Sequence, residues 1–189
     1  MIIRDSNGKP YRRTVVFDVE TTGLHPEAGD RIIEVGAVAL DGVKIVDEFH
    51  SLIDVDRPID PKAQRVHGIT KEMLAGQPRA EEVMPRFRSF IEGSIMIAHS
   101  ADFDMSFIDS EFRRLKLDFR QPYYCTLTLV RKMFPELEGY DLANLYLHFY
   151  GTRPVLTHRA LDDAVITAAI WVVIYRYISA APFSCQIVA

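Results

Sequence analysis

The sequence has few cysteines, no surplus of positive charge and no apolar run long enough to span a bilayer. Its two cysteines, Cys125 and Cys185, lack metal-ligand spacing, which argues against a disulfide scaffold or a zinc site and favours a reducing compartment. The apolar stretch from Ala164 to Tyr175 is about 12 residues long, whereas a membrane span needs about 20. The polar N-terminus contains no apolar core of signal-peptide length. These absences predict a cytoplasmic protein without a membrane partner.

The charge balance does not by itself indicate a nucleic-acid binder. The formal net charge is −4, whereas such proteins usually carry a basic surplus. A protein that binds divalent metals, however, uses several carboxylates for them, so the total charge understates the positive surface available for phosphates. The basic residues also cluster, as in Arg113-Arg114 with Lys116 and Arg120. Such a cluster can equally be a solvated face, so charge leaves nucleic-acid binding open.

Length and composition indicate one globular domain. The chain has 189 residues, of which 48% are hydrophobic, enough for a sizeable core at this length. No internal repeat or Pro/Gly/Ser-rich linker divides it. We expect an N-terminal extension over residues 1–12, a domain over 13–179 and a C-terminal tail over 180–189.

Three apolar segments at the start of the domain have the composition of buried strands. They are Thr14–Glu20, Arg31–Leu40 and Val43–Ile53. A polar loop over Thr21–Asp30 separates the first two. Asp41-Gly42 is predicted to be a two-residue hairpin turn, because glycine tolerates the positive φ that such turns require. The domain is therefore expected to open with three antiparallel strands.

Helical and strand patterns alternate in the rest of the chain. Pro85 makes the start of the first helix uncertain. The expected elements are a helix including Val83–Ile91, a strand at Ser94–Ala98, and helices at Phe103–Leu115, Leu127–Phe134, Leu142–Tyr150 and Ala160–Tyr177. Antiparallel strands followed by alternation predict an α/β fold with a mixed β-sheet flanked by helices.

A pair of acids marks the end of the first strand. Asp18 and Glu20 lie two residues apart, so their side chains project to the same face. Two carboxylates on one face repel each other, and a divalent cation such as Mg²⁺ or Mn²⁺ relieves that repulsion. Two acids at an exposed strand end would show the same pattern, so the pair alone is a weak signal.

Two later segments carry further candidates, each with a competitor. Asp104 follows a short buried strand, where α/β proteins collect site residues, but Asp102 serves as well. His158 and Asp163 stand at the opening of the last helix, and Asp162 competes with Asp163. Acids at a helix start also interact favourably with the helix dipole. Spacing alone leaves both choices open.

Together these segments are far more specific than any one of them. FDVETTGL (Phe17–Leu24), AHSADFDMSFI (Ala98–Ile108) and HRALDDA (His158–Ala164) occur in this order. They resemble the three exonuclease motifs of the DnaQ-like, DEDDh family, and look closest to its polymerase-proofreading members. The linking segments are also similar, notably DRIIEVGAV (Asp30–Val38) and VHGIT (Val66–Thr70). The resemblance covers roughly Arg13 to Trp171.

The resemblance implies a ribonuclease H-like fold and a metal-dependent 3′→5′ exonuclease that releases 5′-mononucleotides. It implies that two divalent ions, Mg²⁺ or Mn²⁺, are held by Asp18, Glu20, Asp104 and Asp163, with His158 as general base. It thereby selects Asp104 over Asp102 and Asp163 over Asp162.

The same resemblance implies a substrate pocket. Its expected residues are Thr21, Thr22, Leu24, His99 and Phe103, with Leu24 wedged against the terminal base. The first three could equally be turn residues, and Phe103 could belong to the core. The family commonly has asparagine where Ser100 stands here, which places a substrate contact or a supporting contact in doubt.

The expected partner is the 3′ end of single-stranded DNA or RNA, and a DNA polymerase is a possible second partner. The motifs do not separate DNA from RNA, so an exoribonuclease of the ribonuclease T or oligoribonuclease type is the alternative. A non-catalytic module that binds nucleic-acid ends is a further alternative, which the intact set of acids disfavours.

Overall fold

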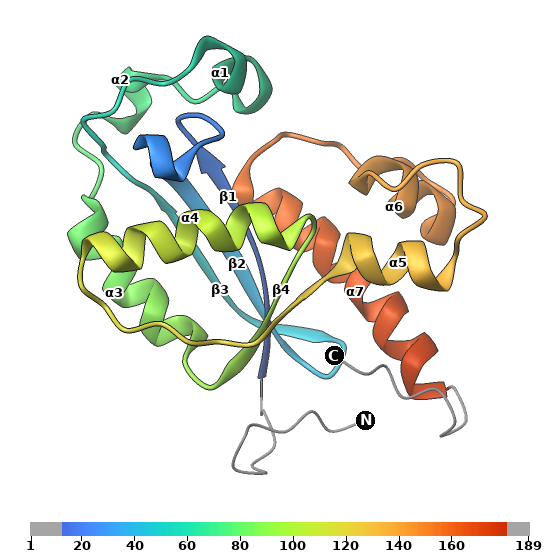
Figure 1. The fold of residues 1–189 in the computed structure, drawn as a ribbon. Coiled ribbons are helices and arrows are strands. Elements are labelled where there is room, and N and C mark those ends of the chain that lie inside the picture. Colours follow the sequence, from blue (N-terminus) through green and yellow to red (C-terminus); the bar gives the residue numbers. More distant parts are fainter. Residues whose placement is uncertain (1–12, 181–189) are drawn as a thin grey trace.

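The computed structural model describes residues 13–180 of the chain. The predicted extension over residues 1–12 and the tail from residue 181 lie outside the described residues. Within them, five strands form one mixed sheet in the order β3-β2-β1-β4-β5, with helices on both faces (Figure 1). The predicted α/β fold class is confirmed.

The first three strands form the predicted antiparallel unit. They are β1 (Arg13–Thr21), β2 (Ile32–Asp41) and β3 (Lys44–Leu52). The hairpin turn lies one residue later than predicted, because Asp41 pairs with Lys44 and leaves Gly42 and Val43 as the turn. Gly42 has φ of +61°, the conformation for which glycine was expected.

Two further strands extend the sheet on the other side of β1. β4 (Ser94–Ala98) runs parallel to β1, and β5 (Tyr123–Cys125) runs parallel to β4. The sequence did not reveal β5, since three residues are too few to show a periodic pattern. The parallel arrangement matters for the site because it brings the carboxyl ends of β1 and β4 to the same edge of the sheet.

One face of the sheet is covered by α3 (Ala80–Ile91) and α4 (Ala101–Arg114), whereas α1 (Pro61–His67) and α2 (Lys71–Leu74) lie beyond one end of the strands (Figure 1). Phe17 of β1, Phe87 of α3 and Phe107 of α4 are fully buried in this layer. α3 begins five residues before Pro85 and contains it. The sequence missed α1, α2 and the 3₁₀ turn η1 (Pro26–Ala28), which are short.

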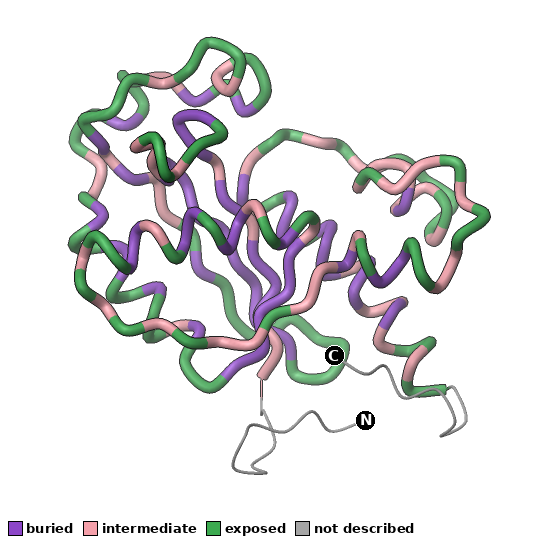
Figure 2. Tube along the Cα trace, viewed as in Figure 1, coloured by how far each residue is buried: buried purple, intermediate pink, exposed green. Residues whose placement is uncertain are grey.

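The other face is covered by α5 (Thr126–Met133), α6 (Leu142–Tyr150) and α7 (Ala160–Ala180). A second hydrophobic core lies on this face and includes Val16, Ile97 and Trp171. Figure 2 shows buried positions running along the central strands, whereas much of the edge strand β3 is exposed.

α7 is longer than predicted and includes Ala180, which had been assigned to the tail. By length and composition its 21 residues suffice to cross a membrane. The apolar stretch recognised in the sequence, Ala164–Tyr175, is by itself too short for a span. Its buried residues, including Ala164, Thr167 and Trp171, pack as part of the core over β1 and β2. This packing is typical of a core helix, and the absence of a membrane partner stays a prediction.

Candidate active site

Three acids meet at the face of β1 that α7 covers. Asp18 and Glu20 project from β1, the central strand, and Asp163 projects from the first turn of α7. One carboxylate oxygen from each lies within 4.8 Å of the others. The fold therefore brings Asp163 to the two β1 acids, although it lies more than 140 positions away from them in the chain. The three carboxylates offer oxygen atoms to a common point.

Asp104 lies next to this cluster on the first turn of α4. Its side chain is buried, and its Oδ1 accepts a hydrogen bond from the backbone N–H of Val19, between the two β1 acids, at 3.3 Å. Asp102 is exposed and accepts a hydrogen bond from the Tyr123 hydroxyl instead. Of the two competing acids, only Asp104 is buried against β1.

Asp163 and Asp162 differ in the same way. Asp162 is exposed and bonded to the hydroxyl of Thr157. Asp163 is 7% exposed, and its Oδ1 is buried without a hydrogen-bond partner among the described residues. A buried carboxylate oxygen without a donor is costly, so this atom is suited to binding a cation.

The electrostatics of the cluster follow from burial and mutual repulsion. Burial, with added repulsion from Asp18, raises the pKa of Glu20 to about 9. Burial likewise raises the pKa of Asp18, with further increases from Asp104 and Asp163. The pKa values of Asp104 and Asp163 are also raised, mainly by burial. Without a cation, protonation is the remaining way to reduce the repulsion.

His158 stands beside the cluster at the start of α7. Its Nδ1 is 4.0 Å from Oδ2 of Asp163, and 47% of its side chain is exposed. Its φ of +50° is unusual for a non-glycine residue. His158, Asp163, His99 and Ser100 line one cleft of about 480 Å³, together with residues of α5 and the segment before α6. The histidine thus faces both the acids and solvent.

The predicted substrate residues differ in what their side chains can reach. The Thr21 hydroxyl donates to the Gly23 carbonyl at 2.6 Å, and that of Thr22 accepts from the N–H of Arg31 at 3.0 Å. Both threonines are buried and shape the turn. Leu24, by contrast, is 68% exposed, so it is the one of these three predicted residues that a ligand can contact.

The other two predicted substrate residues are also partly engaged within the protein. His99 pairs through Nδ1 with the Thr126 hydroxyl at 2.9 Å, and burial lowers its pKa. The Phe103 ring lies 5.0 Å from that of Phe107 and is half-buried at the start of α4. Their substrate roles stay predictions.

Ser100 has an unexpected backbone conformation. It precedes α4 with φ of +62° and ψ of +39°, and its side chain does not cap the helix. Asparagine tolerates this left-handed conformation better than serine does. Backbone geometry is therefore sufficient reason for the asparagine that is common at this position in the family.

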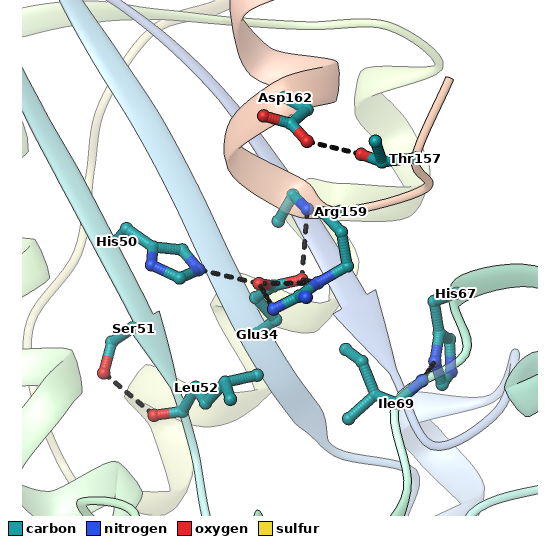
Figure 3. A network of polar contacts seen from close by, with 10 residues as sticks. Glu34, His50, Ser51, Leu52, His67, Ile69, Thr157, Arg159 and Asp162 are labelled. Carbon is teal, nitrogen blue, oxygen red and sulfur yellow. Dashed lines mark hydrogen bonds and ion pairs between the residues drawn. The ribbon is translucent and has the colours of Figure 1, made fainter. Parts of the chain in front are cut away.

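Sequence reasoning missed Glu34. Its side chain has 0% exposure, and it accepts hydrogen bonds from the Arg159 side chain, the N–H of Ala160 and His50 (Figure 3). Burial alone would raise the pKa of Glu34, but the hydrogen bonds from Arg159, His50 and Ala160 lower it overall. A charged residue inside an apolar strand segment was the available signal, because it requires a buried partner.

Comparison with known proteins places this geometry in context. Residues 15–171 match the Exonuclease family. The chain is 44% identical over 158 residues to the PolC-type DNA polymerase III of Thermotoga maritima, covering 83% of the chain but only 11% of that protein. It is 37% identical to the DNA polymerase III subunit epsilon of Aquifex aeolicus, covering 84% of the chain and 78% of the subunit. The chain thus spans about a tenth of the PolC-type relatives.

Two solved structures are similar in fold. Exonuclease X in complex with 5′-overhanging duplex DNA aligns with a TM-score of 0.70 and 33% identity, over 89% of this chain and 94% of that one. A complex of E. coli ExoI with single-stranded DNA aligns with a TM-score of 0.76 over 89% of this chain and 41% of that one. Its identity is 18%, so this likeness shows the fold alone.

Proposed function

The chain belongs to the Exonuclease family, and we propose that it is a metal-dependent 3′→5′ exonuclease that releases 5′-mononucleotides from DNA. The observation that carries the proposal is the convergence of Asp18, Glu20 and Asp163 within 4.8 Å, with His158 at their edge. Such a set of carboxylates beside one histidine suits hydrolysis of a phosphodiester. The similarity to a DNA polymerase III subunit epsilon and to Exonuclease X in complex with duplex DNA supports DNA over RNA as substrate.

The donor set fits hard divalent cations. All four acids supply oxygen, which Mg²⁺ and Mn²⁺ prefer, and no Lys or Arg forms an ion pair with them within residues 13–180. Asp18, Glu20 and Asp163 would hold one ion, and Asp104 beside Asp18 would help to hold a second. Bound there, the ions would supply water activation and neutralise charge that develops on the phosphate.

His158 would accept the proton of the attacking water. Its exposure at the edge of the cleft allows water to reach the imidazole, and its Nδ1 lies 4.0 Å from Oδ2 of Asp163. General bases of this kind act from within hydrogen-bond reach of the proton that they remove.

The exposed Leu24 would contact the base of the terminal nucleotide, beside the turn that Thr21 and Thr22 shape. His99 and Phe103 would border the same region from the start of α4. Aromatic stacking tolerates every base, which suits an enzyme that must remove any nucleotide.

Degradation of 5′-labelled single-stranded DNA and RNA of equal sequence tests the proposal. We expect stepwise loss of mononucleotides from DNA, no activity in excess chelator, and recovery with Mg²⁺ or Mn²⁺. A circular single strand should survive. Faster degradation of RNA would favour the exoribonuclease alternative, and hydrolysis in chelator would contradict the metal assignment.

A polymerase would be the second partner, since relatives are named as DNA polymerase III proteins. If the chain proofreads, a mismatched 3′ end should be removed faster than a paired one, because fewer base pairs must open. Cytoplasmic location stays a prediction.

A further inference from the structure

A buried polar connection outside the acid cluster joins β2 to the start of α7. Arg159 Nη2 donates to Glu34 Oε1 at 2.6 Å, and Arg159 Nε lies 3.0 Å from Oε2. The backbone N–H of Ala160 donates to Oε2 at 3.1 Å. Figure 3 shows the Glu34 carboxylate directed at the Arg159 side chain and at His50. Since Ala160 begins α7, Glu34 acts as a helix cap supplied by a different strand.

A close backbone contact lies two residues farther along the same strand. Gly36 is the partner of Asp18 in the β1–β2 ladder. A Cβ atom at Gly36 would lie 2.1 Å from the backbone nitrogen of Leu161, well inside van der Waals contact. Glycine therefore lets the start of α7 approach β2, and the hydrogen bonds of Glu34 keep the start of α7 in that place. Two independent features of β2 determine where α7 begins.

The residues of the proposed chemistry flank this anchored point. His158 directly precedes Arg159, and Asp163 lies in the first helical turn, where its N–H donates to the Arg159 carbonyl at 3.0 Å. His158 also has the positive φ of +50°. Such a conformation persists at a non-glycine residue only where the surroundings enforce it.

We propose that Glu34 is a positioning residue: through Arg159 and the Ala160 N–H it fixes the turn that presents His158 and Asp163 to the β1 acids. This inference rests on the proposed function for the roles of those two residues. Glu34 lies opposite Glu20 in the strand register, yet its oxygens are occupied by donors. It therefore shapes the site without joining the metal ligands.

The molecule supplies a matched control. Glu111 of α4 is also buried, and it accepts from Arg31 through Nε at 2.6 Å and Nη2 at 2.8 Å. Its Oε1 accepts from the N–H of Ile32 as well, at 3.4 Å. The two pairs share their chemistry and burial, but within residues 13–180 the Arg31–Glu111 pair makes no hydrogen bond to the start of α7.

The experiment compares Arg159→Ala with Arg31→Ala in the full chain, each corrected for its folded fraction. Positioning groups behind ligands typically contribute about 10–100-fold. Arg159→Ala should lower kcat and weaken Mn²⁺ binding, measured by calorimetry, by that factor, with KM changed less than about threefold. Amide exchange in residues 157–163 of the metal-free protein should accelerate. Arg31→Ala should change none of these.

Arg159→Lys adds a conservative test and covers the case in which the alanine variant does not fold. Lysine keeps the charge but lacks the forked geometry of arginine, so part of the lost Mn²⁺ affinity and exchange protection should return. Equal effects of Arg31→Ala and Arg159→Ala, or unchanged exchange in residues 157–163, would overturn the proposal. An inactive wild-type protein would refute the proposed function. Amide exchange in residues 157–163 and Mn²⁺ affinity would still test the positioning role of Glu34, because neither measurement requires activity.

Discussion

Two groups of buried and half-buried acids lie within the same domain and compensate the removal from water differently. Glu34 and Glu111 each face an arginine and a backbone N–H, so their charge is compensated inside the protein. Asp18, Glu20, Asp104 and Asp163 mainly face one another, and burial with repulsion raises their pKa values. The first group stabilises the fold, whereas the second accumulates a charge that suits an external cation.

Replacing a member of the uncompensated group should produce the largest functional effect. Asp163→Asn should lower activity by more than roughly 100-fold, which exceeds the usual range for groups behind the ligands. It should also raise the melting temperature of the metal-free protein, because one source of repulsion is removed. Exonuclease rates and thermal melts in chelator measure both. Substantial remaining activity would show that the wrong acid has been chosen.

His158 provides the next largest effect. His158→Asn should lower kcat by about 10²–10⁴-fold, the usual range for general-base assistance. Asparagine is chosen because it tolerates the positive φ at this position, so a loss of rate is not confused with backbone strain. Mn²⁺ affinity should change little, since no carboxylate is removed. A wild-type rate with a lowered melting temperature would indicate a structural histidine instead.

Glu34 and the uncompensated acids should respond to pH in opposite directions. In the metal-free folded protein, the pKa of Glu20 is raised to about 9. Between the ordinary pKa of glutamate and this raised pKa, the folded state therefore binds more protons than the unfolded state. Stability should therefore fall as pH rises through this window. The pKa of Glu34 is lowered, so its contribution to stability should instead be lost as pH falls below the ordinary pKa of glutamate.

Thermal melts in chelator between about pH 5 and pH 8 test this difference. A loss of about 1 kcal/mol corresponds to roughly 2–4 °C in a domain of this size. Saturating Mg²⁺ should weaken or reverse the trend, because the cation takes the place of the protons. A metal-free protein that becomes more stable as pH rises over this range would contradict the assignment of uncompensated acids.

Ser100 should give the smallest effect. Ser100→Asn should stabilise the protein by about 1 kcal/mol, because a left-handed conformation costs a non-glycine residue roughly 1–2 kcal/mol and asparagine tolerates it better. Activity should stay within about threefold of wild type. Denaturant unfolding measures the change. A large gain in activity without a gain in stability would assign the position to substrate contact instead.

The regular elements could be read from the sequence because their patterns are local. The long strands, the helix at Leu142–Tyr150 and the start of α7 at Ala160 follow from apolar periodicity. The strand β5 and helices α1 and α2 could not, since each is too short to show a period. The hairpin turn lies one residue later than predicted because Asp41 still pairs with Lys44 in the ladder, and a turn sequence alone does not specify the register.

The sequence by itself determined the fold class and, through motifs that resemble a family, the candidate acids and His158. Only the tertiary structure decided which carboxylates face one another, that Thr22 is buried in a turn while Leu24 is exposed, and that Glu34 anchors the start of α7. The physical reason is that motifs record residue types along one strand or helix. Burial, charge compensation and close approach, as at Gly36, depend on segments that meet only when the chain is folded.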